Sequence, residues 1–282
     1  MTQAPLPLPI RVLVKGASTV HTVSFMGGPR SEFAYPRAME AALLARGQAA
    51  DVRTTAVASQ RTKTALKNWE GEIFSWSPDV VVLNYGHFET VHLFLPQRLE
   101  RHANSLAARP GRIRSPYRLV LRKFWKALAS VQQRLDRALP STMFASRPRR
   151  VADDLVLLVE RIQMIGSPLV VIMDLTPPGQ RFRKWFPGMA ERTEVMNAAL
   201  ADVVRRADLP NVLHFRTNDF LVDFVQSGQE VCPDGGHYTP EAHQAIGRAL
   251  TDLILDWAKT QPHLRPGPAP MPEPSDHRAS TV

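Results

Sequence analysis

The chain contains almost no cysteine: Cys232 is the only one among 282 residues, so an intramolecular disulfide is excluded. Secretion therefore gains no support from cysteine usage. The sequence also lacks an uninterrupted run of about 18 apolar residues, the length that a helix needs to cross a bilayer. Residues 1–9 have neither the basic start nor the apolar stretch of a signal peptide. These absences predict a cytoplasmic protein.

Sequence motifs for metals and nucleotides are missing as well. The nine histidines have no spacing with carboxylates or cysteines that is typical of a metal site. Neither a phosphate-binding loop nor the glycine fingerprint of a dinucleotide-binding fold is present. We therefore expect no metal and no cofactor.

Acidic residues are scarce in one segment, and this segment accounts for the positive net charge of the chain. Residues 97–150 carry 14 Lys and Arg but only two acids, a local excess of +12. Because the whole chain carries +9, the remainder has a net charge of −3. Two interpretations stay open: a solvated segment whose arginines pair with the acidic remainder, or a surface for anionic lipid or a nucleotide-bearing acyl donor. Nucleic acid is not expected, because no base-stacking platform accompanies the arginines.

Short apolar segments alternate with segments of helical spacing, which suits one large α/β domain. The expected strands are 12–14, 52–57, 79–83, 169–173 and 212–215. The expected helices are 35–44, 62–73, 151–165, 190–206 and 240–259. This alternation predicts a parallel sheet that is covered by helices on both faces. In such sheets, functional groups gather in the loops at the carboxyl ends of the strands.

The basic segment interrupts this alternation and divides the chain. We expect residues 1–96 and 151–260 to form the α/β domain and residues 97–150 to form an inserted helical cap. An apolar stripe predicts the main helix of the cap, and its members are Leu121, Phe124, Leu128, Val131 and Leu135. Residues 261–282 are rich in proline and lack periodicity, so we expect a disordered tail.

An acid and a histidine stand three residues apart near the end of the chain, in the run Asp234-Gly-Gly-His237. The two glycines favour a turn, and a helix with proline at its start follows. In this arrangement a carboxylate can fix the tautomer of an imidazole that acts as a general base. The best-placed nucleophile for such a base is Ser18, which follows an apolar strand and Gly16.

Taken together, the runs Gly16-Ala17-Ser18 and Asp234-Gly-Gly-His237 resemble the first and last motifs of the SGNH (GDSL) hydrolase superfamily, in a divergent form. The resemblance implies a flavodoxin-like three-layer α/β sandwich with a central parallel sheet. It also implies that Ser18 is the nucleophile, His237 the base and Asp234 its orienting carboxylate. The match extends over roughly residues 11–257, with 97–150 as an insertion.

The two middle motifs of the superfamily are altered. Family members take oxyanion donors from the amide of the nucleophilic serine, from a glycine in the second motif and from an asparagine in a Gly-x-Asn-Asp third motif. Here Ser59 stands at the glycine position, and Phe88 stands at the asparagine position. A phenylalanine side chain cannot donate a hydrogen bond, and losing one oxyanion donor costs on the order of 10²–10³ in rate. We therefore expect the oxyanion or substrate contacts among Ser59, Asn84, Gly86, His87 and Glu89.

The resemblance implies a serine-dependent acyl-ester hydrolase or O-acyltransferase that works through an acyl-enzyme on Ser18. Both activities use the same residues, so the sequence leaves them open. The substrate would be a small-molecule acyl ester or thioester. The positive charge of the basic segment is compatible with an anionic or CoA-linked substrate. The alternative is a non-catalytic binding protein of the same fold with an eroded oxyanion hole. Outside these motifs, we expect His243 to be an exposed helix residue.

Overall fold

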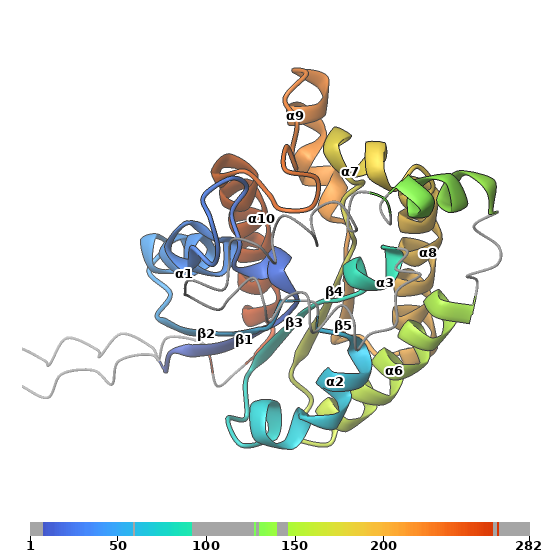
Figure 1. The fold of residues 1–282 in the computed structure, drawn as a ribbon. Coiled ribbons are helices and arrows are strands. Elements are labelled where there is room, and N and C mark those ends of the chain that lie inside the picture. Colours follow the sequence, from blue (N-terminus) through green and yellow to red (C-terminus); the bar gives the residue numbers. More distant parts are fainter. Residues whose placement is uncertain are drawn as a thin grey trace, which may run out of the picture.

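A computed structural model of the protein describes residues 8–58, 60–91, 127, 130–139, 146–261 and 264. Five parallel strands form one sheet, in the order β2-β1-β3-β4-β5 (Figure 1). Their bounds are Ile10–Gly16 (β1), Ala50–Ala56 (β2), Val80–Asn84 (β3), Leu169–Met173 (β4) and Val212–Phe215 (β5). This strand order is that of flavodoxin-like folds, so the expected architecture is confirmed.

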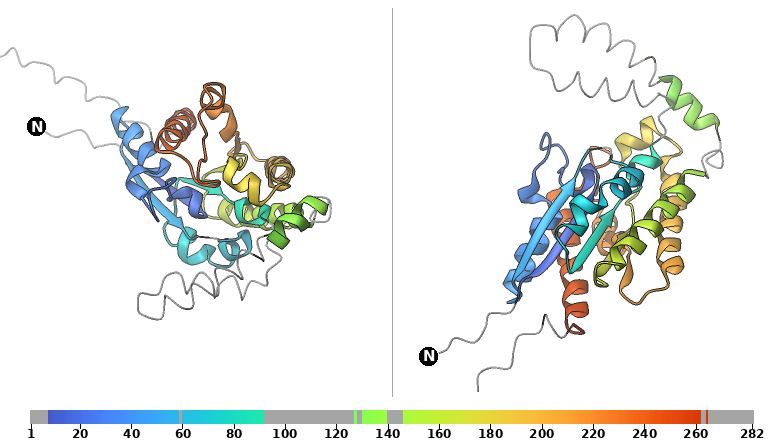
Figure 2. Two further views of the ribbon diagram at one scale, coloured as in Figure 1. Left: turned by 45° about the horizontal axis from the view of Figure 1, so that its top comes forward. Right: turned by 90° about the horizontal axis from the view of Figure 1, so that it is seen from below.

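The sheet is buried because helices cover both of its faces. Helices α1 (Tyr35–Ala45) and α10 (Pro240–Ala258) lie on one face, and α2 (Thr62–Lys67), α6 (Ser146–Gln163) and α8 (Met189–Ala207) lie on the other (Figures 1 and 2). Alternate residues of each central strand enter opposite cores, as the two-residue period of a strand requires. Every residue of β3 and β4 is buried, which explains their uninterrupted apolar sequences.

Several elements differ from the sequence-based expectations. The helix expected over 62–73 ends at Lys67, and a π-helical turn, Glu70–Phe74, follows it. Helix α6 begins five residues early, at Ser146, because Pro148 fits the first turn of a helix. Three short helices were not expected: α3 (His87–Thr90), α7 (Gln180–Trp185) and α9 (Val222–Gln226).

The expected cap falls largely outside the described residues, but one helical piece of it, 130–138, is described. Val131 and Leu135 of the expected apolar stripe are 50% and 36% exposed, whereas Gln132 and Asp136 are buried. The helix therefore turns a polar face towards the protein, and these two apolar residues of the stripe remain exposed. Asp136 explains this orientation, because its carboxylate pairs with the buried Arg192 of α8 at 2.7 Å.

No helix in the described part of the chain combines the length and the apolarity that a membrane span requires. The tail from residue 265 lies outside the described residues.

Candidate active site

Ser18 lies at the carboxyl edge of the sheet, two residues after β1 ends. It begins a 3₁₀ turn, Ser18–Val20, which lifts the chain away from the strand. Gly16 permits this geometry, since a Cβ atom there would lie 2.5 Å from both the Asn84 carbonyl oxygen and the Val20 side chain. The glycine of the first motif is therefore required by close packing against β3.

The turn from Asp234 to His237 holds its own acid in place. The Asp234 Oδ1 atom accepts hydrogen bonds from the backbone amides of Gly236 (3.0 Å) and His237 (2.8 Å). Gly235 has a φ of 111°, and a Cβ atom there would lie 2.1 Å from the Phe182 ring of α7. Glycine is needed at this position both for its backbone angle and for its lack of a side chain.

The structure brings Ser18, His237 and Asp234 together, although 219 residues separate the serine from the histidine. The Asp234 Oδ2 atom lies 2.7 Å from His237 Nδ1, and His237 Nε2 lies 3.1 Å from Ser18 Oγ. Burial acts to raise the pKa of Asp234, but hydrogen bonds from His237 and Gly236 outweigh it and lower this pKa to about 2. The carboxylate is thus ionised, so it can accept a hydrogen bond from a protonated Nδ1. The unprotonated Nε2 is then free to accept a hydrogen bond from the serine hydroxyl.

His87, at the start of α3, faces this turn. Its Nε2 atom is buried and has no hydrogen-bond partner in the described part of the chain. A methyl group built on Gly236 would lie 3.6 Å from this nitrogen. Burial, and secondarily the neighbouring His237, lowers the pKa of His87 to about 4. The Gly236 backbone lies close enough to this imidazole to oppose part of the shift, although His87 Nε2 meets no partner among the described residues at full hydrogen-bond geometry. A neutral imidazole therefore lies beside the histidine of the candidate triad.

The other expected oxyanion or substrate residues have different environments. Asn84 is buried, and its side chain accepts a hydrogen bond from Thr19 and contacts the Met173 sulfur. Glu89 accepts a hydrogen bond from the Thr62 amide at the start of α2. These contacts place both side chains within the packing of the fold.

Gly86 and Ser59 complete that set. Gly86 has a φ of 109°, and a Cβ atom there would meet Met196 of α8 at 3.0 Å. Its demonstrable role is therefore to let α3 start close against α8. Ser59 lies outside the described residues.

Two further histidines near the site were not identified from the sequence as part of it. His21 follows the 3₁₀ turn of Ser18, and its buried Nδ1 has no partner among the described residues. Burial, with a smaller contribution from His237, lowers the pKa of His21. His243 was expected to be exposed, and that expectation is wrong: it is fully buried in α10.

His243 joins two elements that flank the site. Its Nδ1 accepts a hydrogen bond from the Tyr35 amide at 3.1 Å, and its Nε2 lies 3.3 Å from the Thr22 carbonyl oxygen. These partners fix the neutral tautomer with the proton on Nε2. Burial lowers the pKa of His243 to about 4. No periodicity argument could reveal this role, because the two partners lie more than 200 residues upstream.

The two buried neutral histidines His87 and His243 are expected to make the fold sensitive to acid. The unfolded chain binds these protons near the usual histidine pKa of 6.5, whereas the folded chain binds them near 4. The free energy of unfolding should therefore fall as the pH is lowered through this window, by up to about 1.4 kcal/mol per pH unit for each histidine. Urea unfolding across the window would measure the slope. His243→Gln should flatten it, and an unchanged slope in this variant would contradict the assignment.

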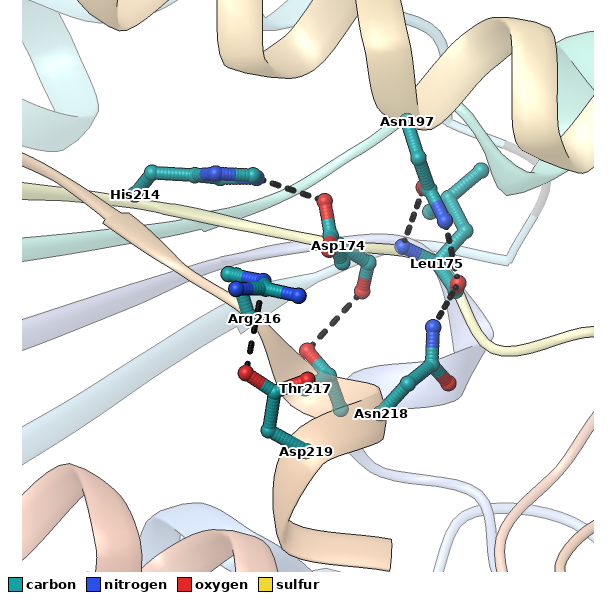
Figure 3. Close-up of polar contacts among 8 residues, drawn as sticks. All are labelled: Asp174, Leu175, Asn197, His214, Arg216, Thr217, Asn218 and Asp219. Carbon is teal, nitrogen blue, oxygen red and sulfur yellow. Dashed lines mark hydrogen bonds and ion pairs between the residues drawn. The ribbon is translucent and has the colours of Figure 1, made fainter. Parts of the chain in front are cut away.

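A second acid–histidine pair lies at the ends of β4 and β5. Asp174 Oδ1 is 2.6 Å from His214 Nε2 (Figure 3). The chain after Asp174 is held by Asn197 of α8, whose side chain pairs with both the amide and the carbonyl of Leu175 (Figure 3). In the described part of the chain, no serine hydroxyl is bonded to His214. This pair thus resembles the Asp234–His237 pair without a nucleophile.

Among the described residues, no three histidine, cysteine or acidic side chains are grouped as metal ligands.

No protein-family model matches the sequence, and no curated protein sequence matches it either. Solved structures do match in fold. A lipase/acylhydrolase from Enterococcus faecalis aligns with a TM-score of 0.58 at 14% identity, over 92% of this chain and 100% of that one. A carbohydrate acetylesterase from Sinorhizobium meliloti aligns with a TM-score of 0.55 at 14% identity, over 88% and 99%.

An acetylxylan esterase from Geobacillus stearothermophilus, in a catalytic-mutant form, aligns with a TM-score of 0.55 at 12% identity, over 88% and 96% of the two chains. At such low identity the similarity establishes the fold alone. The expected SGNH-like α/β fold is confirmed by these matches.

Proposed function

We propose that this chain is a serine-dependent ester hydrolase in which Ser18 is the nucleophile, His237 the general base and Asp234 the residue that orients it. The observation that carries the proposal is the unbroken series of hydrogen bonds from Asp234 through His237 to Ser18. It lies at the carboxyl edge of a parallel sheet, where functional groups of such folds gather. Structural neighbours described as esterases and acylhydrolases support the same class of reaction.

The proposed mechanism gives each residue of the series one role in proton transfer. His237 Nε2 takes the Ser18 hydroxyl proton as the serine oxygen attacks the ester carbonyl. The positive imidazole that results is stabilised by the ionised Asp234 and then donates its proton to the leaving alcohol. A water molecule, activated in the same way by His237, cleaves the acyl-enzyme and regenerates Ser18.

The negative charge that develops on the ester carbonyl oxygen needs a hydrogen-bond donor. Another donor is required here, because Phe88 stands in place of the usual asparagine. His87 is the best-placed side chain, because its buried Nε2 is without a partner in the described residues and lies close to Gly236. A neutral imidazole can act as such an electrophile when its pKa is lowered, as here. We assign His87 the role of oxyanion donor, together with the Ser18 amide that the resemblance implies.

The substrate of this site is proposed to be a small-molecule acyl ester. Transfer of the acyl group to an acceptor alcohol would use the same residues, and it would require that water be kept away from the acyl-enzyme. The described piece of the insertion, 130–138, supports a covering role for this segment. Its Gln133 side chain donates to the Lys184 carbonyl of α7 at 2.5 Å, and Phe182 of α7 packs on Gly235.

Fluorophosphonate labelling tests the proposal directly. These reagents react with activated serines, so intact-mass measurement should find one adduct on the wild type and none on Ser18→Ala. Equal labelling of the two proteins would overturn the assignment of Ser18. A wild type that takes up no label would favour the alternative, a binding protein of the same fold.

A further inference from the structure

Helix α3, which begins with His87, is a single turn of four residues. A helix of this length is not stable by itself, so its position must come from its neighbours. Helix α8 contacts both of its ends. At the start of α3, Gly86 packs closely against Met196, and at its end the Thr90 carbonyl oxygen accepts a hydrogen bond from Arg192 Nε at 2.7 Å. Arg192 and Met196 are four residues apart and so share one face of α8.

Thr90 passes the contact with Arg192 on to His87. The Thr90 hydroxyl donates to the His87 carbonyl oxygen at 2.7 Å, and the Thr90 amide donates to the Gly86 carbonyl oxygen at 3.2 Å. Both bonds lie within the same turn, so a shift of Thr90 would carry the backbone of His87 with it. The His87 imidazole would then move relative to Gly236, which it faces across the candidate site.

The helix 130–138 of the insertion holds the other side of Arg192. Asp136 Oδ1 lies 2.7 Å from Arg192 Nη1, and the two side chains are 0% and 6% exposed. Asp136 Oδ2 accepts a hydrogen bond at 2.9 Å from the Gly188 amide, at the N-terminus of α8, where a negative charge is favourable. Apolar residues can replace a buried ion pair of this kind without loss of stability, so stability alone does not account for the pair.

We propose that Arg192 is a positioning residue for His87, and that Asp136 of the insertion holds Arg192 in the orientation that this role needs. The inference rests on the proposed function, because it takes His87 as the oxyanion donor. Arg192 acts through Thr90 and the short turn of α3 rather than on the substrate. A misplacement of about 1 Å in a catalytic group can cost about 10²-fold in rate. The loss on breaking the contact should therefore approach, but not exceed, the loss on removing His87.

The test is a double-mutant cycle on the hydrolysis of 4-nitrophenyl acetate. Arg192→Met combined with Asp136→Leu removes both charges, so neither is left buried without its partner, and thermal melting checks that the fold is kept. This change should lower kcat about 10- to 100-fold with KM nearly unchanged. In a His87→Ala background it should lower kcat less than about twofold, because the group that Arg192 positions is gone. Equal losses in the two backgrounds would overturn the inference.

Thr90→Val tests the same series of contacts and leaves the buried charges in place. It removes the hydroxyl that ties Thr90 to His87 and should lower kcat about fivefold to tenfold. Thr193→Val is the matched control, since the Thr193 hydroxyl, also buried, donates to the Met189 carbonyl oxygen within α8 at 2.9 Å. The control should keep the kcat of the wild type.

The failure of this inference can be told apart from that of the proposed function. If Thr90→Val and Thr193→Val change kcat alike, or neither changes it, Arg192 does not position His87 through Thr90 and the inference fails, while a loss in His87→Ala still supports the oxyanion role. If His87→Ala itself leaves kcat unchanged, the oxyanion role fails and the inference fails with it. Labelling of Ser18 tests the nucleophile independently of both.

Discussion

Replacing His237 with alanine should lower kcat for ester hydrolysis by about 10⁵- to 10⁶-fold, an effect of the size seen when a triad histidine is removed. The expectation follows from the 3.1 Å contact between His237 Nε2 and Ser18 Oγ, since no other described group is bonded to this hydroxyl. Asp234→Asn should cost less, about 10⁴-fold, because this residue orients and stabilises the base without exchanging protons with the substrate. Steady-state kinetics on a 4-nitrophenyl ester would measure both.

His214→Ala supplies a control with the same chemistry in a different place. His214 also pairs with an aspartate, at 2.6 Å, so its removal breaks a comparable interaction. Its kcat should stay close to that of the wild type. If His214→Ala lowered kcat as much as His237→Ala, breaking either acid–histidine pair at this edge of the sheet would reduce activity by disturbing the structure. The assignment of His237 as the base would then be wrong.

His87→Ala is expected to lower kcat by about 10²- to 10³-fold, the cost of one oxyanion donor, with little change in KM. The reason is that a donor aimed at the carbonyl oxygen helps chiefly when that oxygen becomes negative in the transition state. His87→Gln should recover part of the loss, because an amide can donate from a similar position. Thermal melting must be compared as well, since His87 is buried and its removal leaves a cavity.

The pH dependence of activity distinguishes an oxyanion-donor role of His87 from a role as a second general base. With a pKa near 4, His87 stays neutral above about pH 5, so its contribution should be constant through the neutral range. The ratio of wild-type to His87→Ala activity should therefore not vary with pH there. A ratio that changes strongly around neutrality would indicate that His87 titrates in catalysis and does not act as a fixed donor.

The sheet was predictable because its strands depend on local apolar patterns. Strands β4 and β5 match their expected bounds, and β3 is displaced by a single residue, since each is a short run of apolar residues in the sequence. Elements that depend on tertiary contacts were not predictable. Helix α7 has no buried residue, so it carries no periodic signal, yet its Phe182 packs on the Asp234–His237 turn.

In the candidate site, too, features set by local sequence were predictable and features set by tertiary contacts were not. Ser18, Asp234 and His237 could be proposed from short motifs, because those motifs encode tight turns that glycine makes recognisable. His87 could be named only as one member of a set, because its unused Nε2 becomes evident when α3 is packed beside Gly236. The burial of His243 depends on Tyr35, which stacks on its ring, and on Tyr238, which meets the ring edge-on. The helical pattern of α10 gives no sign of either contact.

The distance of 219 residues between Ser18 and His237 has a consequence for biosynthesis. A ribosome that adds about 5–20 residues per second needs roughly 10–45 s to travel from one to the other. Throughout that interval the nascent chain would carry the proposed nucleophile without the proposed base, so the proposed mechanism predicts no ester hydrolysis before His237 is made. Onset of activity is therefore expected only after translation has passed the Asp234–His237 turn and the two ends of the domain have met.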